Sequence, residues 1–234
     1  MIKAVLLDVD DTLLDHNTAI RNAASSLFDK VITDKEHERQ IFIERWISLN
    51  REWYQKFYAK QVTFQESGRG KLREAFSIYD YQFSDEEADS LLSDYWEEYV
   101  EMCQLFNDVN DCFKQLQQYK IGIVTDGQEN QQVAKIKHCN IYDAMDVVVT
   151  AETAGFAKPA FQIFAYACAK LGVSEKECVY IGDNLELDAI AANNAGMIGI
   201  WLNRQQTKLE SSPQNVKTIN RLTEVLEILQ KLAD

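Results

Sequence analysis

Two aspartates near the N-terminus have the types and spacing for chemistry. Asp8 and Asp10 lie two residues apart in the segment Asp-Val-Asp-Asp-Thr, directly after the apolar run at 4–7. Such a run ending in turn-forming carboxylates predicts a buried strand, although a solvated acidic turn would show the same pattern. Ligands of α/β sheets bind at the carboxyl ends of strands. One carboxylate could therefore act as nucleophile and the other as proton donor, and their joint charge favours a hard cation.

Four further polar residues end an apolar run or flank a helix start. They are Thr125, Lys158, Asp183 and Asp188. Each has an ordinary alternative, because a threonine can be a turn residue, a lysine a solvated charge and an aspartate a helix cap. Taken together and in this order, at the ends of strands, they indicate a single site.

The elements that would position these residues alternate in the second half of the chain. Apolar runs predict strands at 121–124, 147–149, 179–181 and 198–202. Helical patterns between them cover about 128–138, 160–171 and 186–195. Strands that alternate with helices predict a parallel sheet with helices on both faces.

The segment between the first strand and the others has a different texture. Its apolar residues recur at helical spacing, and possible helix starts occur at Thr63, with Glu66 three residues later, and at Ser84. No strand is expected there. We therefore predict an α/β core formed by 1–15 and 107–234, with a helical domain, 16–106, inserted after the first strand.

Composition limits the partners and the chemistry. The chain has 234 residues and a net charge of −13, which disfavours nucleic-acid polymers and anionic membranes but allows a small phosphorylated metabolite. No apolar stretch is long enough for a membrane span, and no signal peptide is evident, so a cytoplasmic protein is expected. The five cysteines are expected to be buried and reduced, and the three histidines form no zinc or triad pattern.

The motifs resemble those of the haloacid dehalogenase-like (HAD) hydrolase superfamily. The matching segments are Asp8-Val9-Asp10-Asp11-Thr12, Thr125-Asp126-Gly127, Lys158-Pro159 and Gly182-Asp183-Asn184 with Asp188. The resemblance implies a Rossmann-like core with a type-1 helical cap. Within the superfamily, the chain is most similar to the phosphatases that include nucleoside 5′-monophosphatases.

The resemblance also implies roles for the acidic residues. Mg²⁺ would be bound by Asp8, by the backbone carbonyl of Asp10 and by Asp183, all hard oxygen ligands. Asp8 would attack phosphorus to form an aspartyl-phosphate, and Asp10 would serve as general acid and then general base.

The remaining motif residues would hold the phosphoryl group or support those that do. Thr125, Asp126, Gly127 and Lys158 form the implied phosphate site. Asp126 departs from many similar proteins, which carry asparagine there, and it is expected to point away from the phosphate or to cap the next helix. The implied supporting residues are Thr12, Asn184 and Asp188.

The function indicated is a Mg²⁺-dependent phosphomonoester hydrolase acting on a small phosphorylated metabolite, with nucleoside 5′-monophosphates as first candidates. A sugar phosphomutase of the same superfamily is the main alternative. A metal-independent 2-haloacid dehalogenase is disfavoured by Asp10, because those relatives lack a carboxylate at that position. A non-catalytic binding protein would have no use for both Asp8 and Asp10.

The helical insertion is expected to select the substrate by closing over the site. It holds most of the aromatic residues, which could stack a nucleobase but mainly suit a small helical core. A basic cluster, Arg69, Lys71 and Arg73, could meet an anionic substrate group, although a solvated helix face is the simpler interpretation.

Overall fold

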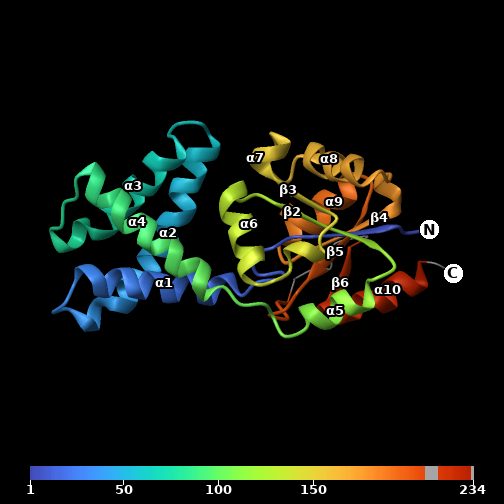
Figure 1. Ribbon diagram of the computed structural model, residues 1–234, viewed down its shortest axis with the longest axis horizontal. Coiled ribbons are helices and arrows are strands. Elements are labelled where there is room, and N and C mark those ends of the chain that lie inside the picture. The colour runs from blue at the N-terminus through green and yellow to red at the C-terminus, as the bar shows by residue number, and fades with distance from the viewer. Residues whose placement is uncertain (209–215, 233–234) are drawn as a thin grey trace. The chain divides into compact units, whose positions relative to one another are not determined.

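The computed structural model describes residues 1–208 and 216–232, which divide into two compact units. Unit 1 comprises Met1–Asp15 and Gln104–Asp234, and unit 2 comprises His16–Cys103. Both units can be followed along the chain by colour in Figure 1.

Unit 1 contains a parallel sheet with strand order β3-β2-β1-β4-β5-β6. The strands are β1 Ala4–Leu7, β2 Lys120–Thr125, β3 Val147–Thr150, β4 Cys178–Gly182, β5 Ile198–Leu202 and β6 Lys217–Ile219. The first five lie at the apolar runs of the sequence. Strand β6 has only one buried residue, Ile219, so it carries no apolar signal that a pattern could detect.

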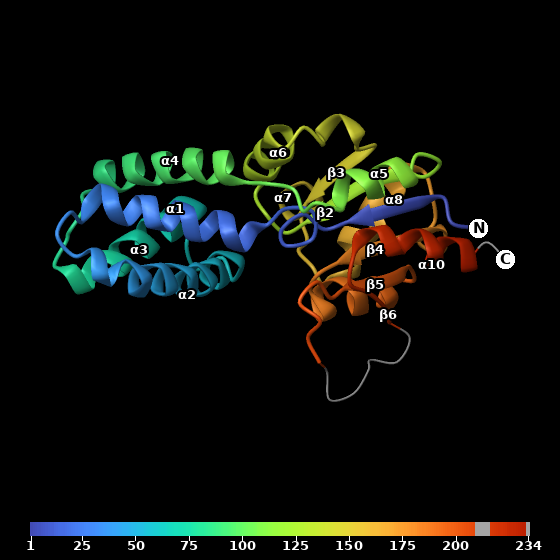
Figure 2. The same cartoon turned by 90° about the horizontal axis from the view of Figure 1, so that it is seen from below.

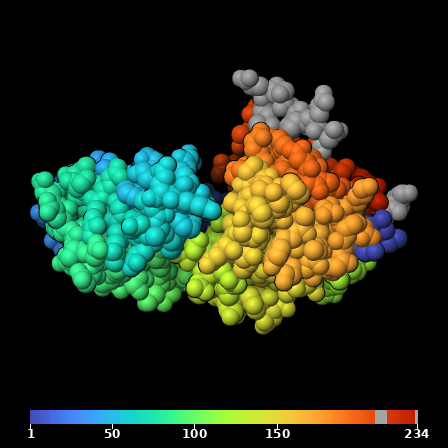
Figure 3. All heavy atoms as spheres, turned by 90° about the horizontal axis from the view of Figure 1, so that it is seen from above, coloured from blue at the N-terminus to red at the C-terminus, as the bar shows by residue number. Residues whose placement is uncertain are grey.

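Helices cover both faces of this sheet, as predicted for alternating elements. They are α5 Val109–Gln115, α6 Glu129–His138, α7 Ala151–Ala154, α8 Phe161–Leu171, α9 Ala191–Asn194 and α10 Val225–Lys231, with 3₁₀ turns at Tyr142–Ala144, Glu175–Glu177 and Leu222–Glu224. Helices α8 and α9 lie on one face, and α5 and α10 on the other (Figures 1 and 2). Helices α7 and α8, yellow to orange, form much of the surface of unit 1 in Figure 3.

One predicted helix differs in detail. The segment expected as a single helix at 186–195 begins with a π-helix, Leu185–Ile190, and continues as α9. A π-helical turn shifts the side chains relative to an α-helix and is frequent at functional sites. Here it carries Asp188.

Strand β1 is the centre of the sheet and is completely buried. Its last residue, Leu7, is in register with Ile123 of β2 and Ile181 of β4. Because the three strands are parallel and in register, the residues that follow them emerge at one edge of the sheet. This register brings together loops that are far apart in sequence.

Unit 2 is helical throughout its regular structure. Its helices are α1 His16–Val31, α2 Arg39–Tyr58, α3 Phe64–Phe76 and α4 Asp85–Met102, with 3₁₀ turns at Glu36–Glu38 and Ser77–Tyr79. Thr63 and Ser84 cap α3 and α4, and each forms a capping box with the glutamate three residues later, as predicted. The aromatic core includes Phe28, Phe42, Trp46, Phe76, Tyr95 and Tyr99.

Residues 104–106 belong to unit 1 rather than to the helical block. The backbone N–H of Asp15 donates to the carbonyl of Gln104, and that of Phe106 donates to the carbonyl of Leu13. These bonds tie the returning chain to the segment that leaves the sheet.

Two further sequence expectations concern membranes and cysteines. Among the described residues, no helix has both the length and the apolar character needed to span a membrane. None of the five cysteines forms a disulfide, and all except the half-buried Cys139 are buried.

Candidate active site

The loop after β1 is held tightly against the sheet. The backbone N–H of Asp8 donates to the carbonyl of Ile181 at 2.9 Å, which fixes Asp8 beside the end of β4. The N–H groups of Leu13 and Leu14 both donate to the carbonyl of Val9, which closes the loop. Asp11 has a left-handed backbone with φ 57°, a conformation that aspartate tolerates better than most residues. The side chain of Asp8 is thereby fixed at the strand end.

Asp8, Lys158 and Asp188 form a buried charge cluster. The Nζ of Lys158 lies 2.7 Å from Asp8 Oδ1 and 2.7 Å from Asp188 Oδ1. The hydroxyl of Tyr180 is 3.2 Å from the same Nζ. Burial by itself would lower the pKa of Lys158, but the carboxylates of Asp188 and Asp8 raise it well above its usual value. The two neighbouring carboxylates therefore favour the charged form of Lys158.

Three carboxylates in this region lie close enough to share a cation. Oxygens of Asp8, Asp183 and Asp188 lie within 4.8 Å of one another. Burial, reinforced by the charges of Asp188 and Asp183, raises the pKa of Asp8 well above its usual value. Burial and the charges of Asp188 and Asp11 raise the pKa of Asp183 to about 7. Three carboxylates share one ammonium, so a further cation would relieve their repulsion.

Asp188 is positioned by the loop that follows β4. Its Oδ2 accepts from the backbone N–H of Asn184 at 2.9 Å, and its Oδ1 accepts from the hydroxyl of Tyr180 at 3.3 Å. A side chain at Gly182 would place its Cβ 2.2 Å from the carboxyl carbon of Asp188, so this approach requires glycine. Asn184 also caps the π-helix, because its Oδ1 accepts from the N–H groups of Glu186 and Leu187.

Thr12 connects the first motif to the last. Its hydroxyl accepts from the backbone N–H of Asp183 at 3.0 Å and lies 3.3 Å from Asp183 Oδ1. The indole N–H of Trp201 donates to the carbonyl of Asp183. Thr12 therefore supports the loop that carries Asp183.

The carboxylate of Asp10 is held by two residues of helix α6. Lys135 Nζ lies 2.6 Å and 2.8 Å from the two carboxylate oxygens of Asp10, and the Gln132 amide donates to one of them at 3.1 Å. Lys135 is buried, whereas the carboxylate of Asp10 is 28% exposed. A Cβ at Gly127 would lie 1.9 Å from the Gln132 amide nitrogen, so this glycine leaves room for Gln132.

The loop after β2 meets the loop that carries Lys158. Thr125 is the last residue of β2 and is buried. The carboxylate of Asp126 accepts from the backbone N–H of Lys158 at 2.8 Å. Of the two roles expected for Asp126, capping of the next helix is wrong, because Gln128 occupies the N-cap of α6 without a side-chain hydrogen bond. Asp126 instead fixes the backbone of Lys158.

Sequence reasoning missed three residues of this site, namely Gln132, Lys135 and Tyr180. Gln132 and Lys135 are three residues apart on α6, which places them on the same helix face and next to each other. That spacing indicates only that the two side chains are neighbours, because the burial of Lys135 and its pairing with Asp10 depend on the fold. Tyr180 gave no signal, because an aromatic residue inside an apolar strand is ordinary core.

The parallel sheet, the helical insertion after β1 and the buried acid–lysine cluster define a Rossmann-like α/β protein with its site at the carboxyl ends of the strands. The haloacid dehalogenase-like hydrolase family model matches residues 2–196, and the chain belongs to this family. The fold class and the enzyme class predicted from the motifs are thereby confirmed.

Similar proteins and a similar solved structure agree with this family assignment. A glyceraldehyde 3-phosphate phosphatase of Methanopyrus kandleri is 28% identical, covering 100% of this chain and 99% of that protein. The pyrimidine 5′-nucleotidase YjjG of Escherichia coli is 32% identical over 48% of this chain and 50% of its own length. The HAD-hydrolase YfnB of Bacillus subtilis, solved bound to magnesium, shares the fold with a TM-score of 0.80 at 24% identity, covering 98% and 99% of the two chains.

Proposed function

We propose that this enzyme is a Mg²⁺-dependent phosphomonoester hydrolase that works through an aspartyl-phosphate. The observation that carries the proposal is Asp8, which is buried and fixed at the end of β1, with Lys158 Nζ 2.7 Å from its carboxylate. A carboxylate held beside the Lys158 ammonium can attack phosphorus while the ammonium offsets the charge of the transferring group.

Asp8 and Asp10 carry out the two steps of the proposed reaction. An oxygen of Asp8 forms a bond to phosphorus as the bond from phosphorus to the leaving alcohol breaks, and Asp10 gives its proton to that alcohol. A water then attacks the aspartyl-phosphate, and Asp10 takes a proton from this water. Inorganic phosphate leaves, and Asp8 is regenerated.

The donor set fits Mg²⁺. Asp8 and Asp183 offer hard carboxylate oxygens, and the proximity of Asp188 makes this corner of the site strongly negative. We assign Asp8, Asp183 and the backbone carbonyl of Asp10 as ligands. A bound Mg²⁺ would supply charge neutralisation and orientation for a phosphoryl oxygen.

Other residues serve the phosphoryl group or fix those that do. Lys158 donates to the phosphoryl oxygens together with Thr125 and Gly127, and Asp126 positions Lys158 through its backbone. Asp188 orients the Lys158 ammonium, which it contacts at 2.7 Å. Thr12 and Asn184 hold the loop that carries Asp183 and Asp188.

Asp10 needs a fixed position to move protons in both half-reactions. Lys135 and Gln132 provide it, because together they bind both oxygens of its carboxylate. We infer that they are positioning residues, which set the orientation of Asp10 without touching the phosphoryl group.

The substrate is proposed to be a small phosphorylated metabolite, with nucleoside 5′-monophosphates as first candidates. The nucleotidase name of the Escherichia coli relative supports this choice. Unit 2 is proposed to supply substrate selectivity, because the assigned catalytic residues all belong to unit 1. A sugar phosphomutase remains the second candidate, since the same aspartyl-phosphate could return its phosphoryl group to a sugar.

Two measurements test this proposal. Purified enzyme is screened for phosphate release from nucleoside 5′-monophosphates and sugar phosphates in the presence of Mg²⁺. Steady release without a sugar-bisphosphate activator is expected, whereas isomerised sugar phosphate without release would indicate the mutase. Acid quenching during turnover should trap phosphate on Asp8, and trapping on another residue would overturn the assignment.

A further inference from the structure

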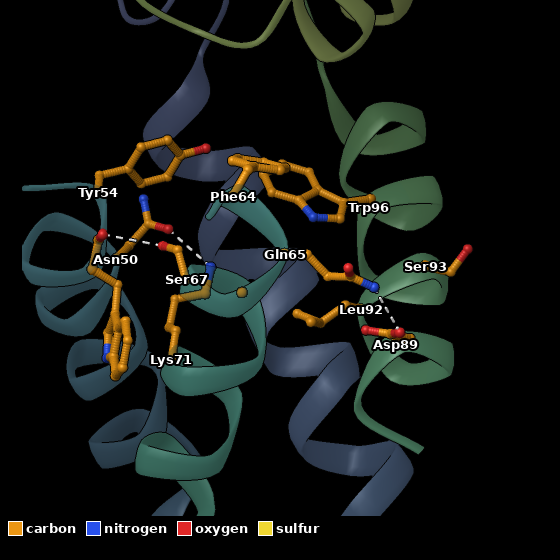
Figure 4. Close-up of a pocket in the computed structure, with 12 residues that line it drawn as sticks. Asn50, Tyr54, Phe64, Gln65, Ser67, Lys71, Asp89, Leu92, Ser93 and Trp96 are labelled. Carbon is orange, nitrogen blue, oxygen red and sulfur yellow. Dashed lines mark hydrogen bonds between the residues drawn. The ribbon is translucent and has the colours of Figure 1, made fainter. Parts of the chain in front are cut away.

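Unit 2 contains a pocket of its own. Its volume is about 320 Å³, and its lining includes residues of α2, α3 and α4 (Figure 4). The aromatic part of the lining consists of Trp53, Tyr54, Phe64 and Trp96. These four side chains are half-buried, unlike the fully buried aromatics of the helical core. Part of each ring therefore faces the pocket or solvent, although one face of Trp53 is covered by the Lys56 ammonium at 3.7 Å from its ring centre.

The same pocket contains a buried cation, Lys71. Lys71 is 4% exposed, and its ammonium donates to Asn50 Oδ1 at 2.9 Å (Figure 4). It also lies 4.1 Å from the ring centre of Trp46 and 5.8 Å from that of Trp96. Cation–π contacts and one amide oxygen compensate only part of the desolvation of an ammonium.

Lys71 has no carboxylate partner within ion-pair distance among the described residues. Its neighbours on α3 are different. Arg69 contacts Asp85 and Asp89, and Arg73 contacts Asp85. The expectation of a solvated basic face therefore fails for Lys71. Asp89 also lines the pocket, but its carboxylate is bound by Arg69. The Asp89 carboxylate therefore does not neutralise the charge of Lys71.

We propose that this pocket binds a small planar molecule that carries a carboxylate. The aromatic rings would stack on the flat part of the ligand, and the Lys71 ammonium would form an ion pair with the carboxylate. Burial lowers the pKa of Lys71 to about 7, and a bound carboxylate would favour its charged form. Binding at this pocket does not depend on the function proposed for unit 1.

The experiment uses the full chain, isothermal titration calorimetry and 2-naphthoate as probe, with 2-naphthamide as a neutral probe of the same shape. We expect one naphthoate per chain with a dissociation constant below about 1 mM, and at least about tenfold weaker binding of the amide. Lys71→Met should weaken naphthoate binding by about tenfold or more and leave amide binding unchanged.

Arg51→Met is the matched control, because Arg51 is an exposed cation of α2 outside the pocket. It removes the same charge and should leave both affinities unchanged. Equal binding of the two probes to the unaltered enzyme would overturn the proposal, and so would the absence of binding at about 5 mM naphthoate. The two-probe comparison needs no variant, so it holds even if Lys71→Met does not fold.

Inhibition of phosphate release then distinguishes two sources of such a ligand. Naphthoate that raises only KM would identify the carboxylated ring as part of the substrate. Naphthoate that changes kcat would identify a separate effector. The inhibition experiment rests on the proposed phosphatase activity, whereas the calorimetric experiment measures binding alone. A failure of the phosphatase proposal would therefore leave the binding result intact, and the reverse also holds.

Discussion

The two units bury cations in opposite ways. In unit 1, Lys158 lies between Asp8 and Asp188, and Lys135 lies against Asp10. In unit 2, Lys71 is buried among aromatic rings with a single amide oxygen as acceptor. In unit 1 the buried lysines fix the carboxylates that we assign to catalysis. In unit 2 the Lys71 ammonium has an amide oxygen but no carboxylate partner among the described residues.

This difference suggests a division of labour. Buried ion pairs contribute little net stability, so their retention in unit 1 fits a positional role. A buried lysine whose desolvation is only partly compensated destabilises its unit, so its presence in unit 2 fits a binding role.

The largest effect is expected at the nucleophile. Asp8→Asn should fold normally and lose turnover by about a thousandfold or more, because an amide cannot attack phosphorus. Phosphate release under saturating Mg²⁺ measures the loss. Asp111→Asn, at an exposed position of α5, is the control and should retain full activity. Retention of more than about a tenth of the activity by Asp8→Asn would exclude the covalent route.

Removal of divalent cations should abolish activity nearly as completely. EDTA treatment should stop phosphate release, and Mg²⁺ should restore it. Ca²⁺ should bind but support turnover poorly, since it takes more ligands at longer distances and could occupy the attacking oxygen of Asp8. Full phosphate release after exhaustive chelation would instead show that the reaction needs no divalent cation.

A smaller loss of activity is expected when Lys135, which binds the carboxylate of Asp10, is replaced. Lys135→Met should lower kcat by about ten- to a hundredfold with little change in KM, because the proton-transfer step depends on the orientation of Asp10. Lys137→Met, on the exposed side of the same helix, is the matched control. A pure KM effect would show that Lys135 contributes to binding rather than to the position of Asp10.

Changes in unit 2 should alter preference more than chemistry. Trp53→Ala removes a pocket wall and should change the ranking of phosphate esters, while hydrolysis of a small aryl phosphate stays within about tenfold. Arg69→Ala should act mainly on stability, because Arg69 is bound by two aspartates. Equal loss for every substrate in a panel would mean that unit 2 does not select.

The smallest effect concerns stability and its dependence on pH. The pKa of Lys71 is about 7 in the folded protein against 10.5 for an ordinary lysine, so the unfolded chain binds more protons between these values. Stability contributed by this group therefore rises with pH through that window and is lowest below it. Lys71→Met should raise Tm at about pH 6 and raise it less at about pH 9. An equal gain at both pH values would show that Lys71 is not buried as a charge.

Several features of this protein could be predicted from its sequence because they depend on neighbouring residues. The first five strands are apolar runs, and the helix starts at Thr63 and Ser84 are capping boxes within four residues. The motifs that contain Asp8, Thr125, Lys158 and Asp183 indicated the family, because their residue types and their order along the chain can be read from the sequence alone.

Only the tertiary structure decided the partners of the charged residues. The ion pair of Lys135 with Asp10 spans 125 positions, and the burial of Lys71 depends on three helices packing around it. Nothing in the local sequence distinguishes Lys71 from Arg69 and Arg73, which are paired near the surface. Side-chain periodicity specifies local conformation and which face is apolar, whereas the desolvation and pairing of a charge depend on distant segments that only the fold brings into contact.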